Sequence, residues 1–293
     1  MAWAQHLIAV DWGTTNRRAW RLADGAVTAE MEDDRGILVV GPGGFDAAVA
    51  EIRGRLGDLP MLLAGMVGSN RGWVEAPYVR CPAGLDDLTA ALAWPEPRRT
   101  CIVPGVAYDA EDGADVMRGE EVQLLGAVAA GLIAPDAPVC HPGTHNKWAL
   151  LRGGRIVHFR TVMTGELFNL LKSHSILSDL LQDEVEGGDA FRAGVRAGLE
   201  QGDVTAALFG VRAGVLLGRL DAAHAADRAS GLLIGADLRT GLRLAEGEIV
   251  VMGRPDLVRL YSIALAEAGR GARAVGGEEA FLAGPRALAE KLA

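Results

Sequence analysis

Two short loops of the chain combine glycine with hydroxyl, amide and charged side chains. Residues 11–16 read DWGTTN, and residues 142–147 read PGTHNK. A glycine lets the backbone approach a phosphate, and hydroxyls and backbone N–H groups donate hydrogen bonds to its oxygens. Asp11 ends an apolar run and is suited to hold the water shell of a Mg²⁺ ion, while Lys147 adds a positive charge. Both loops are therefore candidates for binding the phosphates of a nucleotide.

The two loops occupy equivalent places in an internal repeat. Displaced by 130 positions, the pattern GTxNRxA of residues 13–19 overlies GTxNKxA of residues 143–149. Each loop alone is equally well explained as a hairpin turn, and Lys147 as a solvated lysine. The recurrence favours two paired halves that grip the β- and γ-phosphates from both sides. The residues expected to contact nucleotide are Asp11, Gly13, Thr14, Thr15, Asn16, Gly143, Thr144, His145 and Lys147.

A third candidate is the turn at Gly253, which follows the apolar run GEIVVMG and precedes a helix that starts with Pro255. There the backbone can lie against adenine or ribose, although a tight strand-to-helix turn uses glycine as well. The GxGxxG and GxxxxGK[ST] patterns are absent, so a nucleotide site would be neither a Rossmann fingerprint nor a P-loop.

The elements around these loops alternate between strands and helices, which indicates an α/β fold. Strands are expected at 6–11, in hairpins after both loops, and at 61–68, whose continuous apolar run suits a strand buried on both faces. Helices are expected at 45–56, 164–181, 204–220 and 230–238, at a small-residue stretch from 122 to 134, and after Gly253. Two domains of similar size follow, residues 1–134 and 135–293.

A loop at the end of the 61–68 run is the candidate substrate site, because ligands in open α/β sheets bind beyond the carboxyl ends of strands. Ser69, Asn70 and Trp73 offer a hydroxyl, an amide and a stacking surface for a polyol acid, although turn chemistry accounts for the same residues. Arg160 and Thr164, after the second hairpin, are further candidates for a carboxylate or a hydroxyl. Pro142 and Gly143 separate His141 from His145 and exclude a helical zinc pair.

Composition narrows the class of protein. The net charge of −9 argues against a nucleic-acid binder, and the longest weakly polar stretch is too short to span a bilayer. Three cysteines without a CxxC pair fit a reducing cytoplasm better than a disulfide framework. Glycine is in excess at 39 of 293 residues, which indicates tight turns or backbone close to a ligand.

The order of the two Gly-Thr loops and the later strand–glycine–helix turn resembles the sugar kinase, actin and Hsp70 superfamily. Longer segments are similar to the 2-dehydro-3-deoxygalactonokinase family across essentially the whole chain: AGMVGSNRGW at 64–73, VMRGEEVQLLGA at 116–127, PGTHNKW at 142–148, FRTVMTGEL at 159–167 and SGLLIGA at 230–236. The resemblance implies two actin-like (ribonuclease H-like) domains with a cleft between them. It also implies ATP-dependent phosphorylation of the 6-hydroxyl of 2-dehydro-3-deoxy-D-galactonate in galactonate catabolism, with ATP and Mg²⁺ as cofactors.

The resemblance also implies a catalytic base just before the connecting helix, where this chain has Glu120 and Glu121 instead of the aspartate common in carbohydrate kinases. Glu121 is preferred for its place at the helix start, and the other glutamate is then structural. Helix-dipole placement explains acids there equally well. Arg118 would neutralise charge on the substrate or γ-phosphate, or pair with one glutamate.

Two other functions fit the same features. One is a kinase of the same superfamily for another sugar acid or polyol, and the other is a nucleotide switch or filament subunit like actin or Hsp70. The expected partners are ATP and a small sugar acid, without nucleic acid or membrane, in the cytoplasm, and a homo-oligomer is compatible with these features.

Overall fold

The computed structural model describes residues 3, 5–200 and 202–292. The chain forms two compact units. The first comprises Met1–Asp136, Leu151–His158 and Glu278–Ala293, and the second comprises Ala137–Leu150 and Phe159–Gly277. Each unit is described by itself below.

The main sheet of the first unit has six strands. They are β1 (His6–Trp12), β2 (Arg17–Ala23), β3 (Ala26–Asp33), β4 (Met61–Gly65), β6 (Ala93–Glu96) and β7 (Thr100–Ile102), in the order β3-β2-β1-β4-β7-β6. The central strands β1, β4 and β7 are parallel, and the outer strands are antiparallel to their neighbours. The strand predicted at 61–68 ends at Gly65, where a φ of +93° turns the chain into the 3₁₀ helix η1 (Met66–Gly68).

A smaller sheet and four helices complete the N-terminal part of this unit. The strands are β5 (Tyr78–Arg80), β8 (Gly105–Ala110) and β9 (Gly113–Met117), and the helices are α1 (Ile37–Val40), α2 (Phe45–Leu56), α3 (Leu85–Ala90) and α4 (Glu120–Ala129). The helix predicted at 45–56 is confirmed as α2, and its apolar face packs on the core around β1 and β4. The helix expected at 122–134 is α4, which ends at Ala129.

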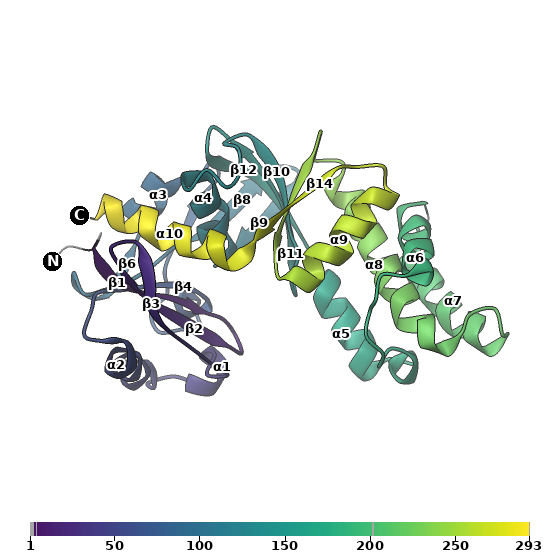
Figure 1. Ribbon diagram of the computed structural model, residues 1–293, viewed down its shortest axis with the longest axis horizontal. Coiled ribbons are helices and arrows are strands. Elements are labelled where there is room, and N and C mark those ends of the chain that lie inside the picture. Colours follow the sequence, from purple (N-terminus) through teal and green to yellow (C-terminus); the bar gives the residue numbers. More distant parts are fainter. Residues whose placement is uncertain (1–2, 4, 201, 293) are drawn as a thin grey trace. The chain divides into compact units, whose positions relative to one another are not determined.

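The C-terminal helix α10 (Gly277–Lys291) packs against α4 (Figure 1). The two backbones approach closely, because a Cβ atom on Gly126 would lie 2.4 Å from the nitrogen of Gly284. Part of the glycine excess therefore serves helix packing.

The second sheet consists of β12 (Arg155–Val162), β11 (Asn146–Arg152), β10 (Ala137–His141), β13 (Ile249–Gly253) and β14 (Ala272–Gly276), in that order. This order repeats that of β3-β2-β1-β4-β7, with β10, β13 and β14 again parallel. The internal repeat predicted from the two loops is thereby confirmed at the level of topology. The loops follow β1 and β10, which hold equivalent places in the two sheets.

The helices of the second unit are α5 (Thr164–His174), α6 (Asp189–Glu200), α7 (Val204–Leu216), α8 (Ala225–Gly241) and α9 (Pro255–Glu267), with the 3₁₀ helices η2 (Ser178–Leu180) and η3 (Ala222–His224). The helices predicted at 164–181 and 204–220 end earlier, at His174 and Leu216. After Leu216 the chain reverses at Gly218, whose φ is +66°. The segment predicted at 230–238 lies inside the longer α8.

Helices α6 and α8 pack through four glycines, Gly194, Gly198, Gly231 and Gly235, two on each helix. A Cβ atom on Gly231 would lie 2.1 Å from the carbonyl oxygen of Phe191, and one on Gly235 would lie 2.2 Å from that of Val195. The backbones thus meet where any larger residue would force them apart. Of the helices in the described ranges, none has the length and apolar character needed to cross a membrane.

Candidate active site

The first Gly-Thr loop is a rigid hairpin with an exposed tip. The N–H of Gly13 donates to the carbonyl of Asn16 at 2.9 Å, and Thr14, Thr15 and Asn16 are exposed. The N–H of Gly36 donates to Thr15 at 2.8 Å, and a Cβ atom there would lie 2.3 Å from the carbonyl oxygen of Thr14. The loop therefore presents hydroxyl and amide groups on a fixed backbone, as a phosphate site requires.

Asp11 stands beside this loop at the carboxyl end of β1. Its Oδ2 accepts a hydrogen bond from Nη2 of Arg18 at 2.8 Å. On the neighbouring strand β4, a Cβ atom on Gly65 would lie 3.6 Å from Oδ1 of Asp11 and 2.8 Å from the carbonyl oxygen of Trp12. A glycine is therefore needed where β1 and β4 end together.

The start of α4 reaches the same place. A Cβ atom on Gly119 would lie 3.3 Å from Cα of Gly65, and Gly119 has a φ of +113°. Asp11, Gly65 and the glutamate pair at the start of α4 are therefore assembled within the first unit. This places the candidate metal-binding carboxylate and the candidate bases around one turn.

The two glutamates have different environments. Glu121 is fully buried, and both of its carboxylate oxygens accept from the N–H of Gly119, at 2.9 and 2.7 Å. Burial and the charge of Glu120 raise the pKa of Glu121 to about 8. Glu120 is half-buried, and its Oε2 accepts from the N–H of Arg118 at 3.2 Å. From the sequence, Glu121 is the preferred base because of its place at the helix start. Helix α4 begins at Glu120, so this criterion favours Glu120 instead.

Arg118 connects this turn to the substrate loop. Its Nη2 donates to the carbonyl of Ala76 at 2.8 Å, and its guanidinium carbon lies 4.3 Å from the ring centre of Tyr78. A Cβ atom on Gly68 would lie 2.9 Å from its Nη1. Its Nε and Nη1 are buried and have no hydrogen-bond partner among the described residues. Arg118 thus keeps, beneath the loop, two buried donor nitrogens without a hydrogen bond to any described residue.

In the substrate loop itself, the three predicted residues are placed differently. The hydroxyl of Ser69 is largely buried and donates to the carbonyl of Met66 at 2.7 Å, so it stabilises the turn. Trp73 is half-buried and packs against the core of the first unit. Asn70 is exposed. The alternative of turn chemistry therefore describes Ser69, while the amide of Asn70 is available to a ligand.

The second Gly-Thr loop rests on the first turn of α5. The N–H of Glu166 donates to the carbonyl of Thr144 at 3.0 Å, and a Cβ atom on Gly165 would lie 2.5 Å from the carbonyl oxygen of Gly143. The side chains of His145 and Glu166 lie 2.5 Å apart. A Cβ atom on Gly143 would meet no atom within 4 Å, so this glycine leaves open space in front of the loop.

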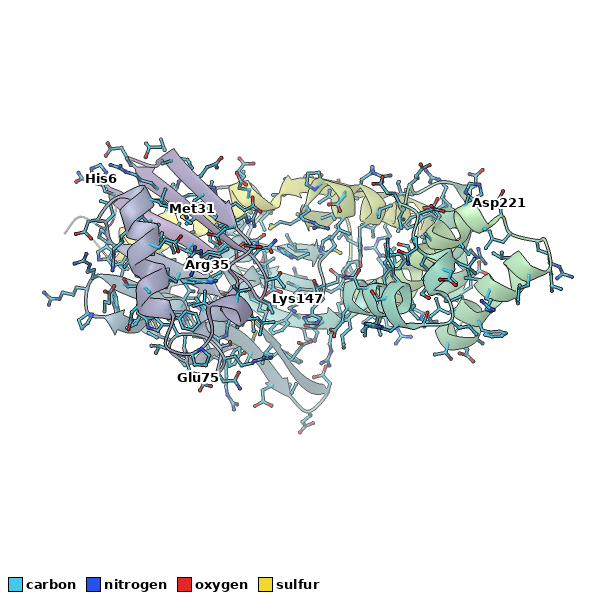
Figure 2. The ribbon with its side chains drawn as sticks, turned by 90° about the horizontal axis from the view of Figure 1, so that it is seen from below. His6, Met31, Arg35, Glu75, Lys147 and Asp221 are labelled. Atoms are coloured by element: carbon cyan, nitrogen blue, oxygen red, sulfur yellow. The ribbon has the colours of Figure 1, made fainter. Side chains whose placement is uncertain are left out.

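Lys147, labelled in Figure 2, lies in the second loop. Its side chain is only 4 % exposed, and its Nζ lies 3.5 Å from the carbonyl oxygen of His145. The alternative of a solvated surface lysine is therefore excluded. The charge is held close to the loop backbone instead.

Asp237 is a buried residue of α8 that the sequence reasoning missed. Its carboxylate accepts hydrogen bonds from Nδ2 of Asn146 at 2.7 Å, Nε1 of Trp148 at 2.6 Å, Oγ1 of Thr164 at 2.6 Å and the hydroxyl of Tyr261. Burial raises the pKa of this carboxyl, against the lowering effect of its donors. Asp237 thus fixes both β11 and α5, the two elements that support the second loop.

The Gly253 turn lies next to the same loop. A Cβ atom on Gly253 would lie 3.4 Å from the carbonyl oxygen of Pro142. A cavity of about 70 Å³ is lined by Gly143 of this loop, by Thr164 and Gly165 of α5, and by mostly apolar residues of α8 and α9. Both nucleotide-binding segments predicted in the second half of the chain are therefore neighbours.

The remaining predicted substrate residues belong to the second unit. Thr164 is 6 % exposed and its hydroxyl is engaged by Asp237, which gives it a structural role in this structure. Arg160 is half-buried on β12 and interacts with other residues.

The donor set near Asp11 suits magnesium held largely through water. The described part of the chain contains no cluster of three or more histidine, cysteine or acidic side chains that would bind a metal directly. A single carboxylate beside a phosphate loop is the usual protein contribution to a Mg²⁺–nucleotide complex. Two of the three cysteines, Cys101 and Cys140, are buried free thiols, and burial raises the pKa of each.

Comparison with known proteins decides the family. The model of the 2-keto-3-deoxy-galactonokinase family matches residues 11–288. The chain belongs to this family. As a member of it, the chain is a carbohydrate kinase that uses ATP, and its fold is the two-domain actin-like α/β fold.

Individual members of the 2-keto-3-deoxy-galactonokinase family are similar over their full length. The 2-dehydro-3-deoxygalactonokinase of Escherichia coli K12 is 37% identical over 296 residues, which covers 98% of both chains. A Rhizobium meliloti protein described as "Probable 2-dehydro-3-deoxygalactonokinase" is 39% identical over 306 residues, covering 100% of this chain and 99% of the relative. A Sinorhizobium meliloti crystal structure that carries the same enzyme name superposes with a TM-score of 0.91 at 37% identity, covering 98% of this chain and 99% of that one.

Proposed function

We propose that this chain transfers the γ-phosphoryl group of ATP to the 6-hydroxyl of 2-dehydro-3-deoxy-D-galactonate, with Mg²⁺ bound to ATP. The relatives described above carry this substrate in their names. The observation in the structure that supports the proposal is the meeting of Asp11, Gly65 and Gly119 in the first unit. Phosphoryl transfer to an alcohol needs a metal–phosphate position next to a base, and this turn offers both.

Each Gly-Thr loop presents donors for phosphate oxygens. Thr14, Thr15 and Asn16 are exposed on one loop, and Gly143 leaves open space on the other, next to the buried charge of Lys147. Fixed donors of this kind stabilise charge on a phosphoryl group without rearranging during the reaction. The apolar cavity beside Gly143 suits one face of the nucleoside.

We assign the role of general base to Glu120. A base must come within hydrogen-bond reach of the proton it removes, and Glu120 is the accessible member of the pair. Glu121 is fully buried and holds the N–H of Gly119, so its role is to fix the turn on which Glu120 stands. Arg118 and Asn70 are the candidates for the carboxylate and hydroxyls of the sugar acid.

In the reaction, the 6-oxygen of the sugar acid forms a bond to the γ-phosphorus while the bond from that phosphorus to the β,γ-bridging oxygen of ATP breaks. The hydroxyl proton passes to the carboxylate of Glu120, and ADP leaves with the electron pair of the broken bond. Magnesium, when bound with ATP, supplies charge neutralisation on the phosphates, and Asp11 is the residue that would hold its water shell. We expect this reaction to take place in the cytoplasm.

The direct test measures ADP formation by the purified chain with Mg-ATP and a panel of sugar acids. The panel contains 2-dehydro-3-deoxy-D-galactonate, its gluconate epimer and D-galactonate. Turnover with the first compound, and a kcat/KM well above that for the others, is the expected result.

Two results would contradict the proposal. If only another sugar acid is phosphorylated, the chain is a kinase with a different substrate. ATP hydrolysis unaffected by every sugar acid, or sedimentation that depends on ATP, would favour a nucleotide switch or filament subunit.

A further inference from the structure

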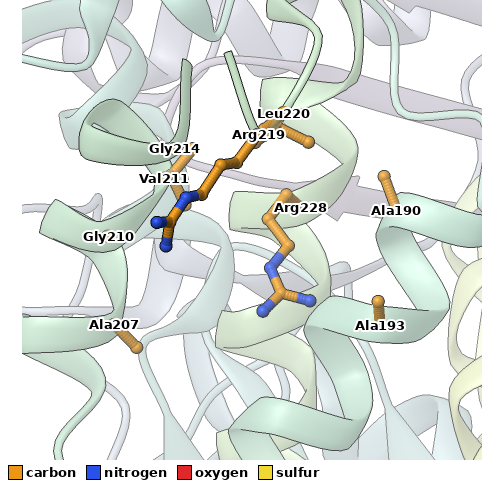
Figure 3. A pocket seen from close by; sticks show the side chains of 9 residues that line it. All are labelled: Ala190, Ala193, Ala207, Gly210, Val211, Gly214, Arg219, Leu220 and Arg228. Carbon is orange, nitrogen blue, oxygen red and sulfur yellow. The ribbon is translucent and has the colours of Figure 1, made fainter. Parts of the chain in front are cut away.

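The second unit contains a larger cavity, of about 450 Å³, that lies between α6, α7 and the start of α8 (Figure 3). None of the Gly-Thr loop or Gly253 turn residues lines it, so it is distinct from the candidate nucleotide site. Its volume falls within the range of pockets that bind small metabolites.

Small residues make the walls of this cavity. Ala190 and Ala193 face it from α6, and Ala207, Gly210 and Gly214 face it from α7. A Cβ atom on Gly210 would meet no other atom within 4 Å. The space therefore results from missing side-chain volume on helices that are otherwise packed.

Two arginines, Arg219 and Arg228, supply the charged groups of the lining, and both side chains extend into the space between the helices (Figure 3). No acidic residue lines the cavity. Among the described residues, neither guanidinium has a hydrogen bond or an ion pair. Arg219 is exposed and Arg228 is half-buried, so the lining presents two positive charges and no acidic side chain to a ligand that enters from solvent.

Two acids of the flanking segments, Asp227 and Asp203, are engaged elsewhere. Asp227 is buried and accepts from the N–H groups of Glu186 and Gly187, at 2.9 and 3.0 Å. Asp203 caps α7 by accepting from the N–H of Ala206 at 3.0 Å. Burial and the nearby charge of Arg196 lower the pKa of Arg228. An anion bound in the cavity would supply a counter-charge for Arg228 that these two carboxylates do not supply.

The backbone holds both arginines in place. After the left-handed turn at Gly218, the N–H of Arg219 donates back to the carbonyl of Gly214 at 2.8 Å. The carbonyl of Arg228 lies against α6, since a Cβ atom on Gly194 would approach its oxygen to 2.5 Å. The backbone at both arginines is therefore fixed, so the two side chains start from defined positions at the edge of the cavity.

We propose that this cavity is a binding site for a small phosphorylated metabolite, whose phosphate is held by Arg219 and Arg228. Guanidinium groups bind phosphate oxygens through paired, charge-assisted hydrogen bonds, and the apolar walls leave room for a short carbon chain. The site is separate from the proposed reaction, so its existence does not depend on the identity of the sugar acid.

The test is calorimetric titration of the full chain with pyrophosphate and with 6-phosphogluconate, with citrate as a carboxylate comparison. Arg228→Met and Arg219→Met each remove one charge, and Gly210→Leu fills the cavity while both arginines remain. We expect each of these variants to lose about 10- to 100-fold in affinity for the phosphate compounds, the effect of removing a charge-assisted contact or the space for it. Arg212→Met, on α7 with Gly210 but outside the cavity lining, is the control for loss of a nearby positive charge and should bind as the parent chain does.

Titration with ADP in the same variants checks that the nucleotide site is intact. The proposal is wrong if the phosphate compounds do not bind up to millimolar concentration, or if their affinity is the same in Arg228→Met and Gly210→Leu as in the parent chain. Equal binding of citrate would change the ligand class from phosphate to carboxylate and contradict the proposal in its stated form. Light scattering that shows a dimer broken by Arg228→Met, with anion binding unchanged, would identify the cavity as a protein interface instead.

Discussion

Nδ2 of Asn146 donates a hydrogen bond to Oδ2 of Asp237 at 2.7 Å, across 91 positions of sequence. Asn146 belongs to the second Gly-Thr loop and is the first residue of β11. The same carboxylate oxygen accepts from Thr164, the first residue of α5, on which the loop rests. One buried carboxylate therefore sets the distance between the strand that leaves the loop and the helix that supports it.

Replacement of Asp237 by Asn is expected to destabilise the second unit and to weaken ATP binding. An amide has one acceptor oxygen for four donors, and its own N–H groups would face those donors. We expect the free energy of unfolding to fall by about 2–4 kcal/mol, as for other broken buried polar networks. We also expect KM for ATP to rise more than kcat falls. Denaturant unfolding and steady-state kinetics measure the two effects. Asp221→Asn, at an exposed cap on η3, is the control and should leave both unchanged.

Gly143→Val tests whether a phosphate lies in front of the second loop. A Cβ atom at this position would meet no atom within 4 Å, so we expect the free energy of unfolding to change by less than about 0.5 kcal/mol. With ATP bound, the same side chain would occupy the place of a phosphate, and KM for ATP should rise by about tenfold or more. Gly165→Ala provides the contrast, because its Cβ would lie 2.5 Å from a carbonyl oxygen and should destabilise the fold directly. An unchanged KM in Gly143→Val would remove the phosphate role from this loop.

The loops and the elements next to them could be predicted from sequence because their signals are local. The pattern of residues 13–19 recurs at 143–149, and the equivalent strand orders of the two sheets explain why. The turn from β13 through Gly253 into α9 likewise follows from an apolar run, a glycine and Pro255 in sequence.

Contacts between distant segments gave no such signal. In the sequence, Asp237 is only an acidic residue in the mostly apolar stretch after SGLLIGA. Nothing in that stretch indicates which four side chains donate hydrogen bonds to it. Residues 278–292 belong to the first unit because Gly284 of α10 packs against Gly126 of α4, a fit that depends on both helices being in place. The burial of Glu121 beside an accessible Glu120 also depends on the packing around α4.

Glu120→Gln and Glu121→Gln test which glutamate is the general base and which one stabilises the turn at Gly119. Loss of the base removes proton transfer, so kcat in Glu120→Gln should fall by about 10²–10⁴-fold with little change in KM or unfolding. Glu121→Gln keeps one acceptor for the N–H of Gly119 and should lower kcat far less. Rate measurements at saturating ATP and sugar acid compare the two variants. The opposite order would assign the base to Glu121.

The raised pKa of Glu121 also predicts a pH dependence of stability. Burial and the charge of Glu120 raise this pKa from 4.5 to about 8, while Arg118 opposes the shift. The folded chain then holds the proton more tightly than the unfolded chain, so this group stabilises the fold at low pH and its contribution is lost as pH rises from about 4.5 to 8. Each unit of pKa shift corresponds to roughly 1.4 kcal/mol. Thermal unfolding across this range should show a smaller decline in Glu121→Gln than in the parent chain. Glu120→Gln removes one cause of the raised pKa and should show a decline between the two. Parallel curves for the parent chain and Glu121→Gln would contradict the raised pKa.

Asp11→Asn should change the dependence of the reaction on Mg²⁺ more than it changes stability. The ion pair of Asp11 with Arg18 is partly exposed, with 24% and 35% of the side chains accessible, and such pairs contribute at most about 1 kcal/mol. Loss of the carboxylate beside the phosphate loop removes a charged acceptor for metal-bound water, so the Mg²⁺ concentration for half-maximal activity should rise by about tenfold or more. Arg18→Gln removes the same ion pair and keeps the carboxylate. Activity titrated with Mg²⁺ at fixed ATP in both variants separates the two causes, because a metal role predicts the shift in Asp11→Asn alone, whereas equal shifts would trace it to the lost ion pair.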